Sequence, residues 1–222
     1  MKNMINGNDI CKYLSIAVLL AVVGCLINML MPTQLNWINK GYPDGKHGNY
    51  NPKDRFKDVV AEFGEPDYVQ GQRGGMAVWS KNTLKSRGHC WDRVLMLDEQ
   101  IPHENPGPHV DFLYSWYSLY VPNDKINDVR AVSESITYDP LKRQVMGRCH
   151  FMGANAATVL LGKRVATGEM TLDEAKKNYG PLIMKTVKGH KTYDANAYNS
   201  YIKELCDYRE EQEKKGYFKV RH

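Results

Sequence analysis

Residues 112–121 read FLYSWYSLYV, and this stretch decides the fold of the chain. Aromatic and aliphatic side chains occupy both alternating sets of positions, so both faces of a strand formed here would be apolar. A strand of this kind is typical of the centre of a sheet. We therefore expect residues 112–121 to form the central strand of a sheet.

Three further segments around this strand also have the composition of strands. They are residues 91–97, residues 131–138, and residues 144–151, which follow a turn at Asp139-Pro140. The last segment alternates, with Val145, Cys149 and Phe151 expected in the core and Met146, Arg148 and His150 expected to face out. Short connections between these segments favour a mostly antiparallel sheet.

The part of the chain before these strands predicts a helix and a hairpin. Residues 54–63 have apolar side chains at helical spacing and end at Gly64. A Gly-rich turn at residues 71–75 separates two short strand-like segments, 68–70 and 76–79.

The part after the strands predicts helices over residues 154–167, 172–179, 182–187 and 193–214. In the last helix Tyr198, Tyr201, Ile202, Leu205 and Tyr208 form a stripe, typical of core or of a partner surface. The sequence therefore predicts the α+β class: a small, mostly antiparallel sheet with a preceding helix and C-terminal helices packed on it. The expected bounds are 54–192 for the domain and 193–222 for the C-terminal helix and tail.

A membrane anchor is predicted near the N-terminus. Residues 14–31 read LSIAVLLAVVGCLINMLM, without a charged side chain, and eighteen helical residues just cross a hydrocarbon core. We expect a tail (1–13), a transmembrane helix that contacts the lipid bilayer (14–31), and an Asn-, Gly- and Pro-rich linker (32–53). Val-Val-Gly-Cys25 suggests instead a cleaved bacterial lipoprotein signal, but the apolar run continues past Cys25 and favours an anchor.

The charge of the chain is unevenly distributed. The formal net charge is +5, and residues 142–191 contain ten Lys or Arg residues against three acidic ones. Such a region could face phosphates, anionic lipid or an acidic protein. The basic residues are not interleaved with exposed aromatic residues, so we expect a solvated face and no nucleic-acid partner.

The five cysteines are scattered and form no C-x-x-C pair. This arrangement is unlike a disulfide framework, and the chain has no N-x-S/T acceptor for glycosylation. We therefore expect the part after the anchor to mature in a reducing, cytosol-like compartment.

The stretch from His103 to Asp111 is the most suggestive of chemistry. His103, His109 and Asp111 on a proline-rich loop could supply three ligands to zinc or iron. The spacing matches no established ligand motif, and hydrogen bonds from the histidines to backbone groups would explain it equally well. We therefore expect no cofactor, and a zinc or iron site at these three residues is the alternative.

No nucleophile motif or phosphate-binding loop stands out in the sequence. There is no G-x-S-x-G, and the glycines near residue 71 lack a following Lys-Ser/Thr. The pairs His89-Cys90 and Cys149-His150 are weak signals for an activated thiol. These observations favour a binding or structural protein over an enzyme.

Four blocks of sequence carry a resemblance to a family: WDRVLMLDEQIPH (91–103), PHVDFLY (108–114), YDPLK (138–142) and RCHFMGANAAT (148–158). They resemble membrane-anchored proteins encoded by nucleocytoplasmic large DNA viruses of algae and protists. This resemblance extends over residues 60–165 and implies a virion component. The expected function is that of a minor capsid protein, which ties the internal membrane to the capsid shell through capsid or membrane proteins.

Three alternatives remain beside this function. One is a metal-dependent membrane enzyme that uses His103, His109 and Asp111. A second is a bacterial-type envelope lipoprotein, because residues 54–79 resemble the opening of BamE-type domains: a helix, G-x-P, a strand, a turn and A-x-W. A third is an accessory subunit of an organellar membrane complex.

Overall fold

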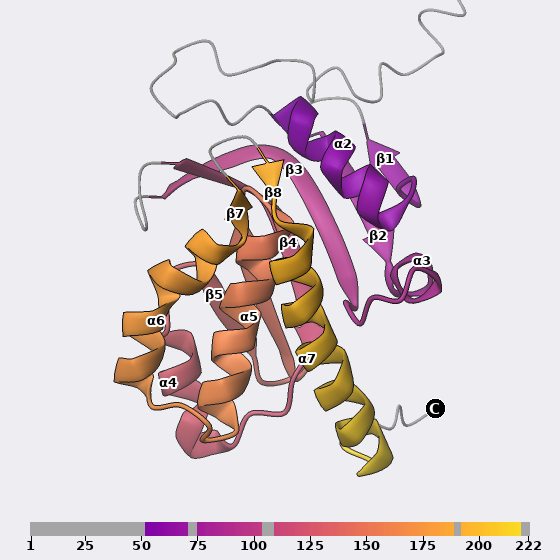
Figure 1. Cartoon of the computed structure of the whole chain (residues 1–222). Helices are drawn as coiled ribbons and strands as arrows, with labels where there is room; N and C mark the ends of the chain where they lie inside the picture. The colour runs from indigo at the N-terminus through magenta and orange to yellow at the C-terminus, as the bar shows by residue number, and fades with distance from the viewer. Residues whose placement is uncertain (1–51, 71–74, 104–108, 189–191, 219–222) are drawn as a thin grey trace, which may run out of the picture.

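The computed structural model describes residues 52–70, 75–103, 109–188 and 192–218 (Figure 1). Six strands form one sheet in the order β1-β2-β3-β4-β6-β5, and all neighbours are antiparallel. The strands are β1 (Tyr68–Gln70), β2 (Met76–Ser80), β3 (Arg93–His103), β4 (His109–Ser118), β5 (Ile136–Asp139) and β6 (Gln144–Cys149). The α+β class, the antiparallel sheet and the internal position of β4 are therefore confirmed.

The helices of the described part are α2 (Pro52–Phe63), α3 (Lys81–Ser86), α4 (Ile126–Arg130), α5 (Met152–Ala166), α6 (Leu172–Lys185) and α7 (Ala195–Lys214). A short 3-10 helix, η1 (Asn123–Lys125), precedes α4, and β7 (Val187–Lys188) pairs with β8 (Thr192–Tyr193). Figure 1 shows α2, α5 and α7 on one side of the sheet, and α6 packs against α5. None of the helices in the described ranges is long and apolar enough to cross a membrane, and residues 14–31 lie outside those ranges.

Two predicted elements differ from the observed ones. Of the predicted strand 131–138 only residues 136–138 pair with β6, together with Asp139, because Ser133 Oγ accepts a hydrogen bond from the Ser135 amide and forms a turn. The predicted helices 172–179 and 182–187 form the single helix α6, which continues through Pro181. Leu182 and Ile183 are buried, and their packing outweighs the lost backbone hydrogen bond.

One face of the sheet, here the covered face, forms the core beneath the helices. Its buried side chains come from alternating positions: Ala77, Trp79, Val94, Met96, Leu113, Ser115, Tyr117 and Val145. Small residues let α5 approach closely, because a Cβ at Gly147 would lie 3.0 Å from the Asn155 carbonyl oxygen. The Asn155 amide in turn donates to the Leu113 carbonyl and to Ser115 Oγ.

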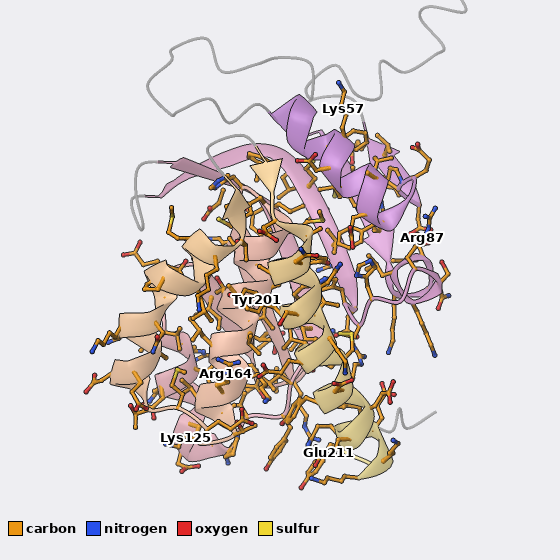
Figure 2. The ribbon with its side chains drawn as sticks, in the orientation of Figure 1. Lys57, Arg87, Lys125, Arg164, Tyr201 and Glu211 are labelled. Atoms are coloured by element: carbon orange, nitrogen blue, oxygen red, sulfur yellow. A yellow bond between two sulfur atoms is a disulfide. The ribbon has the colours of Figure 1, made fainter. Side chains whose placement is uncertain are left out.

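Helix α7 belongs to the same core. Tyr198, Ile202 and Leu205 from its stripe are buried, and Tyr117 Oη donates to the Leu205 carbonyl at 2.6 Å. These three residues of the stripe therefore belong to the core, and Tyr201 and Tyr208 are partly buried at its edge. Figure 2 labels Tyr201 and Arg164 along α7 and α5, where the Arg164 guanidinium bonds both carboxylate oxygens of Glu204.

A disulfide joins Cys90, just before β3, to Cys206 in α7, with Cα atoms 5.3 Å apart. The expectation of scattered, unbridged cysteines is thus wrong for this pair. The two residues are 116 positions apart in the sequence, and only the docking of α7 brings them together. Spacing alone gave no signal of this contact, and the bond also counts against a strictly reducing compartment.

Candidate functional site

The three predicted ligands of the histidine-rich segment lie in strands, and residues 104–108 between them lie outside the described ranges. β3 ends at His103 and β4 begins at His109, and the two residues are register partners. Asp111 lies within β4 and is fully buried. Its Oδ2 atom lies 3.3 Å from Nε of Arg148, so its charge faces a guanidinium. The expectation of a loop is corrected here, because pairing continues past the irregularity between Met96 and Ile101.

The metal site itself stays a prediction. The side chains of His103 and His109 lie outside the described part of the chain. Within the described part, no three His, Cys, Asp or Glu side chains are grouped closely enough to hold a metal ion. Asp111 alone of the three predicted ligands can be assessed, and its contact with Arg148 already gives its charge a partner.

Cys149 and His150, which the sequence marked as a weak signal for an activated thiol, lie in contact with each other. Cys149 Sγ lies 3.4 Å from His150 Nδ1, and both residues are buried. The expectation that His150 faces out is wrong, because β6 ends at Cys149 and the strand alternation ends with it. Cys149 is 1% exposed, as the sequence predicted for a core residue, so this thiol is poorly placed to attack a substrate.

A second buried histidine, His89, lies between α2 and α7. Its Nε2 atom is 3.3 Å from Oε1 of Glu62, and its Nδ1 atom is 3.4 Å from Tyr198 Oη. Burial lowers the pKa of His89 to about 4, and burial also raises the pKa of Glu62. His89 is therefore neutral at pH 7 and acts as a hydrogen-bonding core residue.

A groove of about 610 Å³ runs along the α5–α7 seam, and its charges neutralise one another. Buried Lys163 bonds Glu169 at 2.7 and 2.8 Å and lies 3.4 Å from Glu204. Further along, Lys203 pairs with Asp207 and Lys215 with Glu211, which Figure 2 labels near the end of α7. The last two pairs lie along α7 itself, and the contacts of Lys163 and Arg164 with Glu204 are the ion pairs that join α5 to α7 here.

The face of the sheet opposite the helices, here the open face, is apolar and only partly buried, except at Tyr114, which is 8% exposed, and at Phe112, which the alternation of β4 places on this face and which is fully buried. It consists of Met76, Val78, Leu95, Leu97, Tyr114, Trp116 and Met146, with Arg93 and Arg148. The register places these residues in rows across the strands, for example Val78, Leu95 and Tyr114. In the described part of the chain, α2, α5 and α7 all lie on the other side (Figure 1).

Aromatic and cationic side chains are organised on this open face. The rings of Tyr114 and Trp116 are nearly parallel, with centroids 6.1 Å apart. The Arg93 guanidinium lies 4.0 Å from the centroid of the Trp116 ring, which is a cation–π contact. Sequence reasoning found the residues of the central strand but did not predict which of its faces the helices cover. The open face is the surface of the described domain that best fits a binding role.

Comparisons with family models, with curated proteins and with solved structures find no match to this chain.

Proposed function

We propose that this chain is a non-enzymatic, membrane-anchored virion protein, a minor capsid protein that links the internal membrane to the capsid shell. Residues 14–31 act as the single-pass anchor, residues 32–53 act as the linker, and the open face binds a neighbouring protein. The open face is the observation that carries this proposal. Its aromatic residues, methionines and arginines are the types enriched in protein interfaces.

The chemistry of the open face defines its partner. A strip of aliphatic side chains from β2 and β3 offers apolar area, and Trp116 supplies a large ring of the kind that often dominates binding energy. Exposed Arg93 adds positive charge to this strip, whereas the charge of Arg148 is already paired with Asp111. The matching partner is a capsid or membrane protein whose surface has an apolar strip flanked by carboxylates.

The first experiment measures this protein in purified virus particles before and after detergent stripping, by quantitative peptide mass spectrometry. We expect several copies in each particle, retained with the shell or released with the membrane proteins. Its absence from particles would refute the virion function.

The second experiment locates the binding surface. A photo-crosslinking amino acid replaces Leu95 on the open face, and a matched variant carries it at exposed Lys176 on α6. We expect the Leu95 variant to crosslink one capsid or membrane protein within particles and the Lys176 variant to crosslink none. Equal crosslinking from both positions would contradict a role for the open face.

The metal-dependent enzyme is retained as a second candidate because the register pairs His103 with His109. Elemental analysis of the purified full chain tests it, and stoichiometric zinc or iron that is lost in a His103→Ala and His109→Ala variant would favour it. The lipoprotein alternative predicts cleavage before Cys25, so an intact Met1 in the purified protein excludes it.

A further inference from the structure

The Cys90–Cys206 disulfide lies at the surface of a cavity beside α7. The cavity has a volume of about 240 Å³, and Lys81, Lys85, Arg209, Glu210 and Glu213 also line it. Both cysteines are only partly buried, whereas Cys149 is 1% exposed. The sulfur atoms of the disulfide are therefore reachable from solvent in the folded domain.

We propose that this disulfide is a thiol-exchange site and that the cavity admits a small thiol. The thiolate of the incoming molecule attacks one sulfur of the Cys90–Cys206 bond, which breaks, and a mixed disulfide forms. The other cysteine leaves as a thiolate and takes a proton from water. A second small thiol then attacks the mixed disulfide, so that two thiols are oxidised to one disulfide and the protein disulfide is reduced to two thiols.

Three cationic side chains lie near the bond. Arg209 pairs with Asp92 and Glu213, and Lys81 lies 3.8 Å from Asp92, so Lys85 is the cation that best favours this exchange. A nearby Lys or Arg lowers the pKa of a cysteine thiol and so stabilises it as a leaving group. Arg209 is fixed close to the bond, because its Nη1 atom donates to the Cys90 carbonyl oxygen at 2.6 Å. Lys85, on the rim, has no carboxylate within 4.0 Å among the described residues.

The contacts of α7 hold the helix in place when the disulfide is open. Arg209 Nη2 bonds Asp92 Oδ1 at 2.6 Å, and Trp91 Nε1 donates to Tyr198 Oη at 3.2 Å. Because these contacts do not involve sulfur, the two cysteines stay near each other after reduction. The disulfide can therefore be reduced and formed again in the folded domain, depending on the thiols in the surrounding solution.

The test is a reduction time course on the full chain in detergent, with the neutral dithiol dithiothreitol at several concentrations. Samples are quenched with acid, alkylated and analysed by peptide mass spectrometry, which separates Cys90 and Cys206 from the other cysteines. We expect the reduction rate to rise about twofold when the dithiol concentration is doubled. Circular dichroism should stay unchanged, and Cys149 should resist alkylation under native conditions as the internal control.

A reduction rate that does not depend on dithiol concentration would overturn the proposal, because reduction would then wait for global unfolding. Loss of the circular dichroism signal on reduction would also overturn it, since the bond would then be needed to keep the domain folded. A Cys206→Ser variant gives a second readout. Its Cys90 thiol should react with a soluble aromatic disulfide in the native state, while Cys149 should not.

Discussion

The same strands form both faces of the sheet, but the side chains of the two faces differ in burial. Trp79 faces the helices and is fully buried, with its Nε1 donating to the Gly64 carbonyl at 2.8 Å. Trp116, two strands away, lies on the open face beneath Arg93 and is only partly buried. Burial on the covered face therefore stabilises the fold, whereas the partly exposed apolar area of the open face is the surface that we propose for a partner.

Removing Trp79 should give the largest effect on stability. A Trp79→Ala substitution deletes a fully buried ring between Phe56 and Phe63 and also the hydrogen bond to Gly64. We expect a loss of about 3–5 kcal/mol in the free energy of unfolding. Urea denaturation of the purified domain measures it, and a loss below that of Trp116→Ala would contradict the assignment of the two faces.

Asp111 tests whether the buried carboxylate serves the fold. An Asp111→Asn substitution keeps the shape of the side chain but leaves the partly buried Arg148 without its counter-charge. We expect a loss of about 2 kcal/mol, less than for a fully buried ion pair because Arg148 reaches solvent. Exposed Asp124→Asn is the matched control, and equal small losses in both variants would show that the pair with Arg148 contributes little.

Because of His89, the free energy of unfolding of the domain should depend on pH. Its pKa of about 4 lies below the value of about 6.5 for an unfolded chain, so the unfolded state binds more protons in this window. Stability is therefore complete above pH 6.5 and falls as the pH decreases toward 4. We expect a loss of about 2 kcal/mol, reduced by the nearby Glu62 carboxylate. Urea midpoints at pH 7 and pH 4.5 check it, and a His89→Gln variant should remove most of this dependence.

Trp116 should show the smallest change in stability. We expect Trp116→Ala to alter the free energy of unfolding by less than about 1 kcal/mol, because the ring packs mainly against neighbours on an uncovered face. The same substitution should greatly weaken the crosslink from residue 95 to the proposed partner. A large loss of stability would indicate that another part of this chain covers the ring.

Local patterns predicted most of the secondary structure. The apolar run at 112–121 identified an internal strand, and helical spacing identified α2, α5 and α7. The register irregularity between Met96 and Ile101 was not predictable, because it depends on cross-strand pairing. Pro181 misled the prediction of α6 because the packing of Leu182 and Ile183 outweighs a local breaker.

The candidate sites were harder to predict than the fold. The position of the open face depends on strand order, and no local sequence pattern indicates which face of a strand the helices will cover. The Cys90–Cys206 bond depends on the docking of α7, and the Cys149–His150 contact depends on the end of β6 at Cys149. The sequence singled out Asp111 for its residue type, but its partner Arg148 comes from a strand 37 positions away in the sequence.

Helix α5 lies between the sheet, α6 and α7, and every residue in it except Arg164 is buried. Because such a helix has no solvated side, it is stable only when the sheet on one side and helices α6 and α7 on the other are assembled around it. The domain should therefore fold as one cooperative unit, with no stable half. Backbone amides in the middle of α5 should exchange hydrogen with solvent only when the whole domain opens, which makes them reporters of its global stability.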